Sequence, residues 1–232
     1  MVSSCATILP SNQEYVKVAE GSIDRLKEFC SNIDQWKLVK TNGSGSDLIE
    51  VFTKESDIKG AEDMYLLRTT YQTSVANIVA LLLPWYPYRL KWDNLLEAAE
   101  IIKNFGDDNY IINHRTRGKY TLSPRESVDA VKILKDGMNM YFGSTCAPCG
   151  DVMVPAHDKY VRTTQYLGGY RLLQIDENRV EFCMLFHADL KLPVPKLFSS
   201  LVNGLKPKLM IEKADNLRKA VKSMTVQAEH LL

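Results

Sequence analysis

The stretch Asp189-Leu190-Lys191-Leu192-Pro193-Val194-Pro195 decides the fold, because it joins a long series of predicted strands to one amphipathic helix. This closing helix is predicted over residues 192–222, where apolar side chains recur at the spacing of one helix face. A helix that follows all the strands has to pack against the sheet that those strands form. We therefore expect it to lie across a curved sheet like a lid, with room for a cavity beneath it. Its apolar face consists of Leu197, Phe198, Leu201, Val202 and Leu205.

The rest of the chain is predicted to form an N-terminal helix and a meander of strands. Ser11-Asn12-Gln13-Glu14 has the Ser-x-x-Glu form of a capping box, and it predicts a helix over residues 11–31. From Leu95 onward, β-prone runs alternate with short polar turns, among them Gly168-Gly169. Short turns between consecutive strands favour antiparallel pairing. The predicted fold class is therefore α+β, in a single domain over residues 1–232.

The composition is typical of a folded chain without a strong electrostatic preference. Of the 232 residues, 45% are hydrophobic and 25% are charged, so the chain can form a substantial core. Lys and Arg total 29 against 28 Asp and Glu, and this balance predicts no nucleic-acid partner. Residues 1–10 lack the features of a signal peptide, and the most hydrophobic window, Val75 to Tyr86, is too short to span a bilayer. We expect a cytoplasmic protein whose 5 cysteines are free thiols.

Four segments occur in an order that suggests a known family. They are Arg89-Leu90-Lys91-Trp92-Asp93, Ser123-Pro124-Arg125-Glu126, Val161-Arg162 followed by Gly168-Gly169, and Ala188-Asp189-Leu190 followed by Pro193 and Pro195. In this order and spacing they resemble motifs of the StAR-related lipid transfer (START) domain family. The resemblance extends over essentially the whole chain.

The resemblance implies a helix-grip fold, in which a curved antiparallel sheet of about nine strands surrounds the C-terminal helix. It also implies one lipid in the tunnel between them, transient contact with membrane surfaces, and no need for a metal or cofactor. Such a protein would be a monomeric carrier and not an enzyme. The alternatives are a lipid sensor that does not shuttle its ligand and, less favoured, an enzyme that uses the cavity.

Strand alternation predicts which side chains line the tunnel, because successive residues of a strand point to opposite faces of a sheet. The alternative is that the same side chains form an ordinary core. A shift of one residue would invert the assignment on any strand. The predicted lipid-binding set is Asn113, Arg115, Val131, Ile133, Met140, Phe142, Phe182, Met184, Phe186, Leu201 and Leu205.

Arg115 suggests the chemistry of the ligand. The resemblance implies an acid and an arginine in the tunnel of sterol-binding members, but alignment on Pro124-Arg125 places Arg115 and Val131 at those two positions. An arginine in an apolar tunnel is costly unless an anion meets it, and a guanidinium can bind two oxygens of a phosphate. We therefore predict a glycerophospholipid headgroup near Arg115, with Arg117 as a second candidate. The alternatives are a solvated arginine at a strand end, and a sterol or ceramide ligand.

The resemblance implies a mobile gate at the loop from Arg115 to Pro124, which corresponds to the omega loop of the family. The closing helix carries a local excess of basic residues that could contact an anionic membrane. Pro207 is expected to bend or break this helix.

Two motifs suggest other chemistry. Cys146-Ala147-Pro148-Cys149 has the spacing of a redox pair or half a zinc site, but we predict an ordinary loop with two thiols and no metal. None of the four histidines lies in a recognisable catalytic motif, and His187 is expected to be a hydrogen-bonded structural residue.

Overall fold

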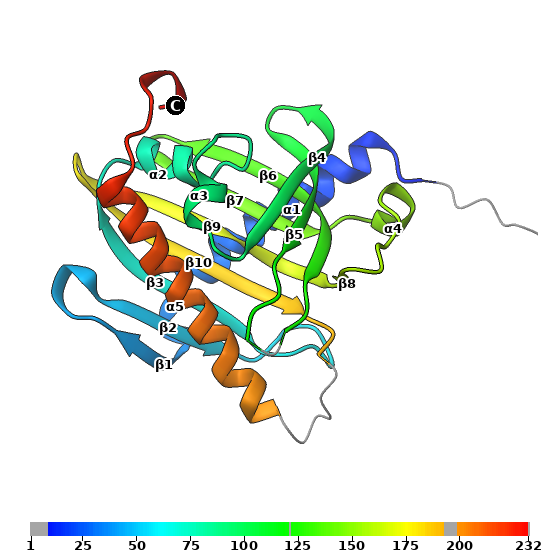
Figure 1. Ribbon diagram of the computed structural model, residues 1–232, viewed down its shortest axis with the longest axis horizontal. Helices are drawn as coiled ribbons and strands as arrows, with labels where there is room; N and C mark the ends of the chain where they lie inside the picture. The colour runs from blue at the N-terminus through cyan, green and yellow to red at the C-terminus, as the bar shows by residue number, and fades with distance from the viewer. Residues whose placement is uncertain (1–8, 121, 193–198, 232) are drawn as a thin grey trace, which may run out of the picture.

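The computed structural model describes residues 9–120, 122–192 and 199–231, with the side chains of residues 199–203 outside the described part. Ten strands form one sheet, and nine of them follow the order β1-β2-β3-β10-β9-β7-β6-β5-β4 (Figure 1). The neighbours in this order are antiparallel, whereas β8 pairs with β6 in parallel. The strands are β1 (Lys37–Asn42), β2 (Ile49–Lys54), β3 (Met64–Gln72), β4 (Leu96–Gly106), β5 (Asn109–Thr116), β6 (Arg125–Asp136), β7 (Asn139–Cys146), β8 (Val161–Arg162), β9 (Thr164–Asp176) and β10 (Arg179–Asp189).

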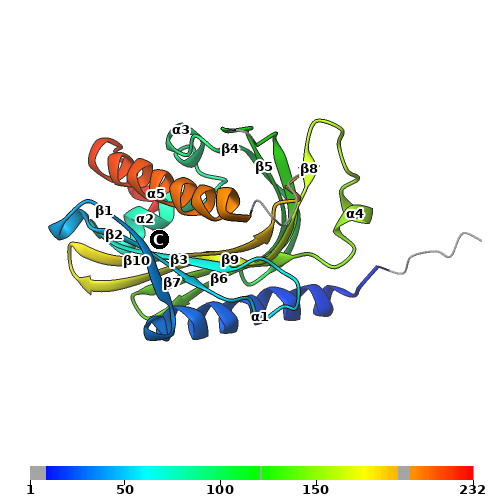
Figure 2. The same ribbon diagram turned by 90° about the horizontal axis from the view of Figure 1, so that it is seen from below.

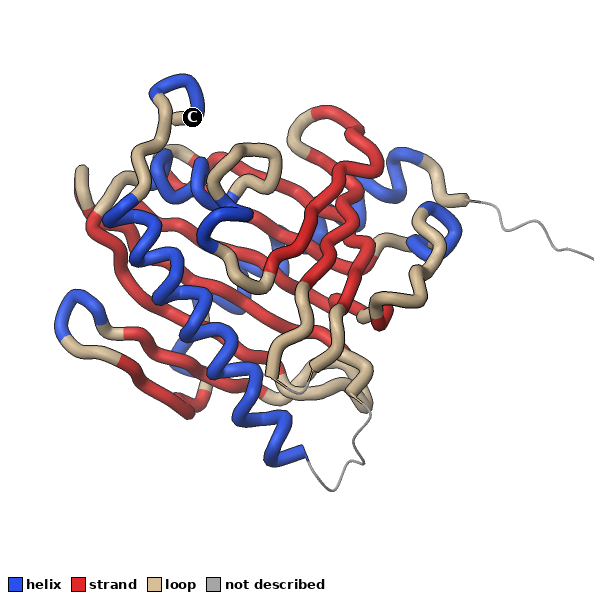
Figure 3. The backbone as a smooth tube through the Cα atoms, in the orientation of Figure 1, coloured by secondary structure: helices blue, strands red, loops and turns tan. Residues whose placement is uncertain are grey.

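Helices cover both faces of this curved sheet, so the expected α+β architecture with a sheet around the closing helix is confirmed. The α-helices are α1 (Asn12–Ser31), α2 (Val75–Leu82), α3 (Arg89–Trp92), α4 (Gly150–Met153) and α5 (Ser199–Ser223). Figure 2 shows α1 along one face and α5 across the other, with α2 and α3 beside α5. The strands run beneath α5 as a continuous layer in Figure 3. Among the described residues, no helix is both long enough and apolar enough to cross a membrane.

The N-terminal helix α1 begins where the capping box predicts. The Ser11 hydroxyl accepts a hydrogen bond from the Glu14 backbone N–H, and the Glu14 carboxylate accepts one from the Ser11 backbone N–H at 2.7 Å. The apolar side of α1 buries Leu26 and Phe29 against the outer face of the sheet. The helix can lie this close because Gly143 of β7 has no Cβ atom. A Cβ atom at this position would overlap the side chain of Ser22.

The pair Gly168-Gly169 does not form the expected turn. Both glycines lie inside the continuous strand β9, and the chain reverses only after Asp176, where β10 begins at Arg179. Gly169 has a φ of +153°, and a Cβ atom there would overlap the carbonyl oxygen of Phe142 on β7. Gly169 therefore allows the backbones of β7 and β9 to approach each other closely, and such close approach is a common reason for glycine inside a strand.

The closing helix α5 crosses the concave face of the sheet as a single helix with Pro207 inside it. The expected break at Pro207 is therefore absent, because proline can remain in a helix at the cost of one backbone hydrogen bond. The predicted beginning at residue 192 was early, and residues 193–198 lie outside the described part. Hydrogen bonds attach α5 to β3: Tyr71 donates to the Ala214 carbonyl at 3.0 Å, and Arg218 donates to the Thr69 hydroxyl at 2.7 Å and to the Thr70 carbonyl at 3.5 Å.

Candidate functional site: a cavity beneath the closing helix

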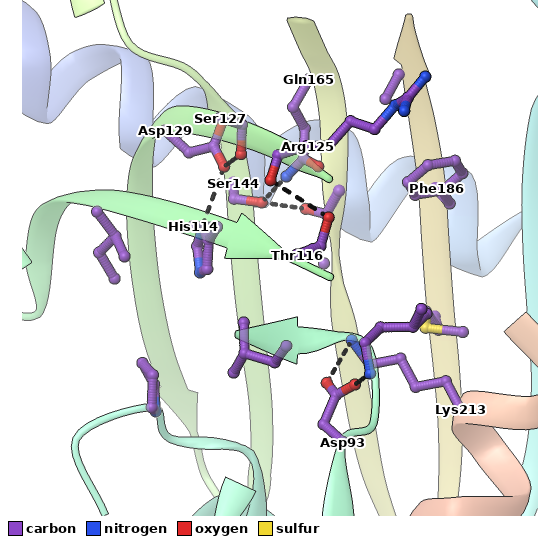
Figure 4. A pocket seen from close by; sticks show the side chains of 18 of the residues that line it. Asp93, His114, Thr116, Arg125, Ser127, Asp129, Ser144, Gln165, Phe186 and Lys213 are labelled. Carbon is purple, nitrogen blue, oxygen red and sulfur yellow. Dashed lines mark hydrogen bonds and ion pairs between the residues drawn. The ribbon is translucent and has the colours of Figure 1, made fainter. Parts of the chain in front are cut away.

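A cavity of about 290 Å³ lies between the concave face of the sheet and α5. Its wall is formed by α2, by the strands β4 to β7, β9 and β10, by the β5–β6 loop (residues 117–124) and by α5. The volume is close to the lower end of the range of about 300–1,000 Å³ that is typical of ligand sites. Figure 4 shows a part of the wall where polar side chains such as His114, Asp129 and Lys213 lie among apolar ones such as Phe186. Apolar residues of the wall include Leu82, Leu96, Val131, Phe142, Met184 and Phe186.

The predicted lining set is only partly gathered at this wall. Met140 and Phe182 are buried in the apolar core next to the cavity and do not line it. Leu205 is half-buried on α5 outside the wall, and the side chain of Leu201 lies outside the described residues. Five members of the predicted set do line the cavity, and their contact with a lipid stays a prediction. They are Val131, Ile133, Phe142, Met184 and Phe186.

On β5 the structure inverts the expected orientation. Ile112, His114 and Thr116 line the cavity, whereas Asn113 and Arg115 point to the other side of the strand. Asn113 is fully buried there and donates to the Ser127 carbonyl at 3.1 Å. Because protein covers both faces of the sheet, polarity did not reveal which residues of β5 face inward.

Arg115 forms ion pairs outside the cavity. Its guanidinium group lies 3.1 Å from the carboxylate of Glu100 and 4.0 Å from that of Glu126. A phosphate is expected near an arginine that lies without a partner in an apolar tunnel. Arg115 does not line the cavity, and Glu100 and Glu126 already partner its charge.

A buried cluster of charges lies at the α3 end of the cavity, where Asp93 is only 3% exposed. Its Oδ2 atom is 3.4 Å from Arg89 Nε and 3.1 Å from Lys213 Nζ. Burial alone would raise the pKa of Asp93, but Lys213 and Arg89 outweigh burial and lower it to about 2. Arg89 also donates to the Tyr170 hydroxyl at 3.2 Å. Two cations and one carboxylate leave this part of the wall with a net positive charge.

Tyr170 responds to that charge. Burial alone would raise the pKa of its hydroxyl, but the positive charges of Arg89 and Lys213 lower the pKa overall. In the sequence, Arg89 and Asp93 stand out only as part of a motif, and Lys213 is one of the basic residues of the closing helix. The cluster could not be found from sequence spacing, because its members come from α3, β9 and α5.

A second polar group lies on the β5–β6–β7 part of the wall (Figure 4). The Ser127 hydroxyl donates to Asp129 Oδ2 at 2.7 Å, and His114 Nδ1 lies 3.2 Å from the same oxygen. On the neighbouring strands, Gln165 donates to the Ser144 hydroxyl. The sequence did contain a signal for part of this group, since Ser127 and Asp129 share the strand parity of the predicted wall residue Val131.

The β5–β6 loop is attached to α5 at the edge of the cavity. Lys119 forms an ion pair with Glu212, and the Tyr120 hydroxyl donates to the same carboxylate at 3.1 Å. The ammonium group of Lys208 lies 3.9 Å from the centre of the Tyr120 ring. Burial alone would raise the pKa of Glu212, but these hydrogen bonds from Lys119 and Tyr120 lower it. The loop and the helix are thus connected by a small, partly exposed polar contact.

Neither the Cys146–Cys149 motif nor His187 lines the cavity. Burial, the largest effect, raises the pKa of the Cys146 thiol, which disfavours the reactive thiolate. His187 is fully buried, and its Nε2 lies 3.0 Å from the Ser56 hydroxyl, as expected for a hydrogen-bonded structural residue. Among the described residues, no group of three or more His, Cys, Asp and Glu side chains is arranged to hold a metal ion.

Comparison with known proteins identifies the fold and the family. The START domain model matches residues 22–226. The human StAR-related lipid transfer protein 5 superimposes with a TM-score of 0.80 at 20% identity, covering 91% of this chain and 98% of that one. Human STARD10 gives a TM-score of 0.69 at 16% identity, covering 93% of this chain and 82% of that one. A comparison of the sequence with curated proteins found no match.

A bacterial protein has the same fold. The STAR-related lipid transfer protein fragment from Xanthomonas axonopodis gives a TM-score of 0.61 at 18% identity, covering 82% of this chain and all of that one. At these identities the structural likeness establishes the fold, and the family assignment rests on the match over residues 22–226.

Proposed function

Because the chain belongs to the START domain family, a family of lipid-binding and lipid-transfer domains, we propose that it carries one lipid molecule through the cytoplasm in the cavity beneath α5. The observation that carries this proposal is the apolar cavity between the sheet and the closing helix. Each CH₂ group of an acyl chain that is shielded from water gains about 0.8 kcal/mol. A protein that encloses the chains therefore lowers the barrier to moving a lipid between membranes.

We propose that the ligand is a glycerophospholipid, and we now place its phosphate near Arg89 and Lys213 instead of Arg115. The support is electrostatic, since these two cations face one carboxylate, Asp93, in a wall that is otherwise mostly apolar. A phosphate would neutralise the excess positive charge, and charge-assisted hydrogen bonds are stronger where water is excluded.

The proposed membrane contact involves fewer basic residues than the sequence suggested. Lys206, Lys213 and Arg218 of α5 are turned into the protein, where they form ion pairs with Glu62, Asp93 and Asp47. The exposed lysines of the described part of α5 are Lys208, Lys219 and Lys222. Each exposed lysine would contribute about 1 kcal/mol near an anionic surface, so we propose a weak and transient association of a monomer.

Native mass spectrometry combined with lipid extraction tests occupancy, and a fluorescent assay of phospholipid exchange between vesicles tests transfer. We expect one phospholipid per chain and protein-dependent exchange. Purified protein that holds no lipid and moves none would contradict the proposal, whereas occupancy without exchange would identify a sensor.

One wall residue supplies a matched pair of variants for these measurements. Val131 is 7% exposed and lines the cavity. Val131→Trp should fill the cavity and reduce lipid occupancy by about tenfold or more, whereas Val131→Ala should keep it. Equal occupancy in both variants would show that lipid binds elsewhere.

A further inference from the structure

We propose that His114 selects the polar group of the ligand by accepting a hydrogen bond from it at Nε2. The ligand class is a lipid whose polar end carries a hydroxyl or ammonium group as hydrogen-bond donor. This inference rests on the proposed function, because it assumes that a lipid occupies the cavity. It concerns the second polar group of the wall, which the phosphate contact at Arg89 and Lys213 does not use.

The hydrogen bonds around His114 determine what its ring can do. Its Nδ1 lies 3.2 Å from Asp129 Oδ2, and a carboxylate can only accept, so Nδ1 carries the hydrogen. In the neutral ring the other nitrogen, Nε2, is then an acceptor. Within the described part of the chain, the hydrogen bonds include none to Nε2. In this neutral form the histidine presents an acceptor that no described protein group uses.

Burial separates the roles of His114 and its neighbours. The His114 side chain is 22% exposed and lines the cavity, whereas the Asp129 side chain is 1% exposed. Asp129 is much less accessible than His114, and we assign it the role of a positioning residue that orients the ring. Ser127 holds the same carboxylate oxygen from the other side at 2.7 Å. A fixed ring loses little freedom on binding, which favours selectivity.

Two nearby hydroxyl groups are engaged with protein atoms. The Thr116 hydroxyl donates to the Arg125 carbonyl at 3.3 Å, and Ser144 donates to the Gly168 carbonyl at 3.3 Å. When a lipid excludes water from this wall, an unpaired Nε2 would lose its hydrogen bond to water. A ligand with a donor replaces that bond, whereas a ligand that has only methyl groups there leaves the acceptor buried and unsatisfied.

The test compares lipids that have the same acyl chains and differ only in the donor. Phosphatidylethanolamine and phosphatidylcholine test an ammonium donor, because trimethylation removes its hydrogens. Diacylglycerol and its methyl ether test a hydroxyl donor in the same way. Dissociation constants for the full-length chain are measured by competition with a fluorescent lipid. They also show whether the protein prefers the ammonium donor or the hydroxyl donor.

We expect the wild type to bind the donor lipid of at least one pair about tenfold more tightly than its methylated partner. His114→Leu should remove this preference without weakening binding of the methylated lipid. Asp129→Asn should reduce the preference, because the ring then loses the partner that fixes its tautomer. The control is His157→Leu, in the loop before β8, which should keep the full preference.

Different failures have different meanings. No uptake of any of these lipids by the wild type would overturn the proposed function itself. Uptake with equal affinity for donor and methylated lipids would overturn only the role of His114, as would an unchanged preference in His114→Leu. If Asp129→Asn weakened all four lipids equally, the carboxylate would be structural and its positioning role would be overturned.

Discussion

The ammonium nitrogen of Lys213 lies 3.1 Å from Oδ2 of Asp93, and this ion pair ties the closing helix to the segment between α3 and β4. Asp93 is almost completely buried from solvent, with 3% of its surface exposed. The ion pair connects the element proposed to act as a lid with the cavity wall. The same atoms therefore contribute both to stability and to the charge that a ligand meets.

Asp93→Asn should lower the free energy of unfolding by about 2 kcal/mol at pH 7. The pKa of Asp93 is lowered from 3.8 to about 2 in the folded state, so the ionised form is favoured by folding. This contribution is fully present above pH 3.8 and is lost as the pH falls towards 2. Urea unfolding of wild type and variant between pH 2.5 and 7 should show the difference shrinking with acidification.

The control for Asp93 is Asp151→Asn, since Asp151 is 81% exposed although it pairs with Arg162 at 2.7 Å. Exposed pairs contribute only about 0–1 kcal/mol. A difference between wild type and Asp93→Asn that stays constant across the pH range would contradict the role assigned to the carboxylate.

Lys213→Met should weaken phospholipid binding about tenfold, whereas Arg115→Leu should change it less than about twofold. Lys213 lines the cavity with its charge only partly compensated, but Arg115 is paired with two carboxylates on the opposite side of β5. Titration with a fluorescent phosphatidylcholine measures both. A larger loss of affinity in Arg115→Leu than in Lys213→Met would indicate that the phosphate binds near Arg115.

Glu212→Gln should accelerate lipid exchange between vesicles about threefold to tenfold, without lowering occupancy at equilibrium. The change removes the ion pair with Lys119 and weakens the hydrogen bond from Tyr120, so the β5–β6 loop separates from α5 more easily. Glu28→Gln, on the exposed side of α1, is the control. An exchange rate that stays at the wild-type value would mean that this contact does not limit opening.

Gly169→Ala should destabilise the fold by more than about 3 kcal/mol, because the added Cβ atom overlaps the Phe142 carbonyl and the φ of +153° disfavours a side chain. Gly21→Ala should stabilise the protein by about 0.5–1 kcal/mol, since Gly21 lies inside α1 with open space around it. Thermal unfolding compares the two. Similar effects of both substitutions would contradict the close approach of β7 and β9.

Much of the fold could be predicted because it depends on local patterns. The Ser11 cap and the strands separated by polar turns each arise from interactions between residues close in the sequence. The glycine pair in β9 was misinterpreted because glycine serves both turns and close backbone contacts. The sequence pattern alone does not distinguish these two uses.

The candidate site was predicted less completely, for a physical reason that β5 illustrates. Strand alternation has a period of two, so an assignment shifted by one residue turns every side chain to the wrong face. On β6 and β10 the apolar residues Val131 and Met184 indicated the inner face correctly. On β5 both faces are covered by protein, and the inward residue His114 is no more apolar than its outward neighbour Asn113.

The sequence by itself therefore determined the order of helices and strands, the motifs of the family and the presence of a lid-like helix after the sheet. Only the tertiary structure decided that Asp93 meets Lys213, that Asp129 orients His114, and that Arg115 finds its partners outside the cavity. These pairings join residues from different elements. Their electrostatic energies depend on distance and burial, which no local pattern in the chain specifies.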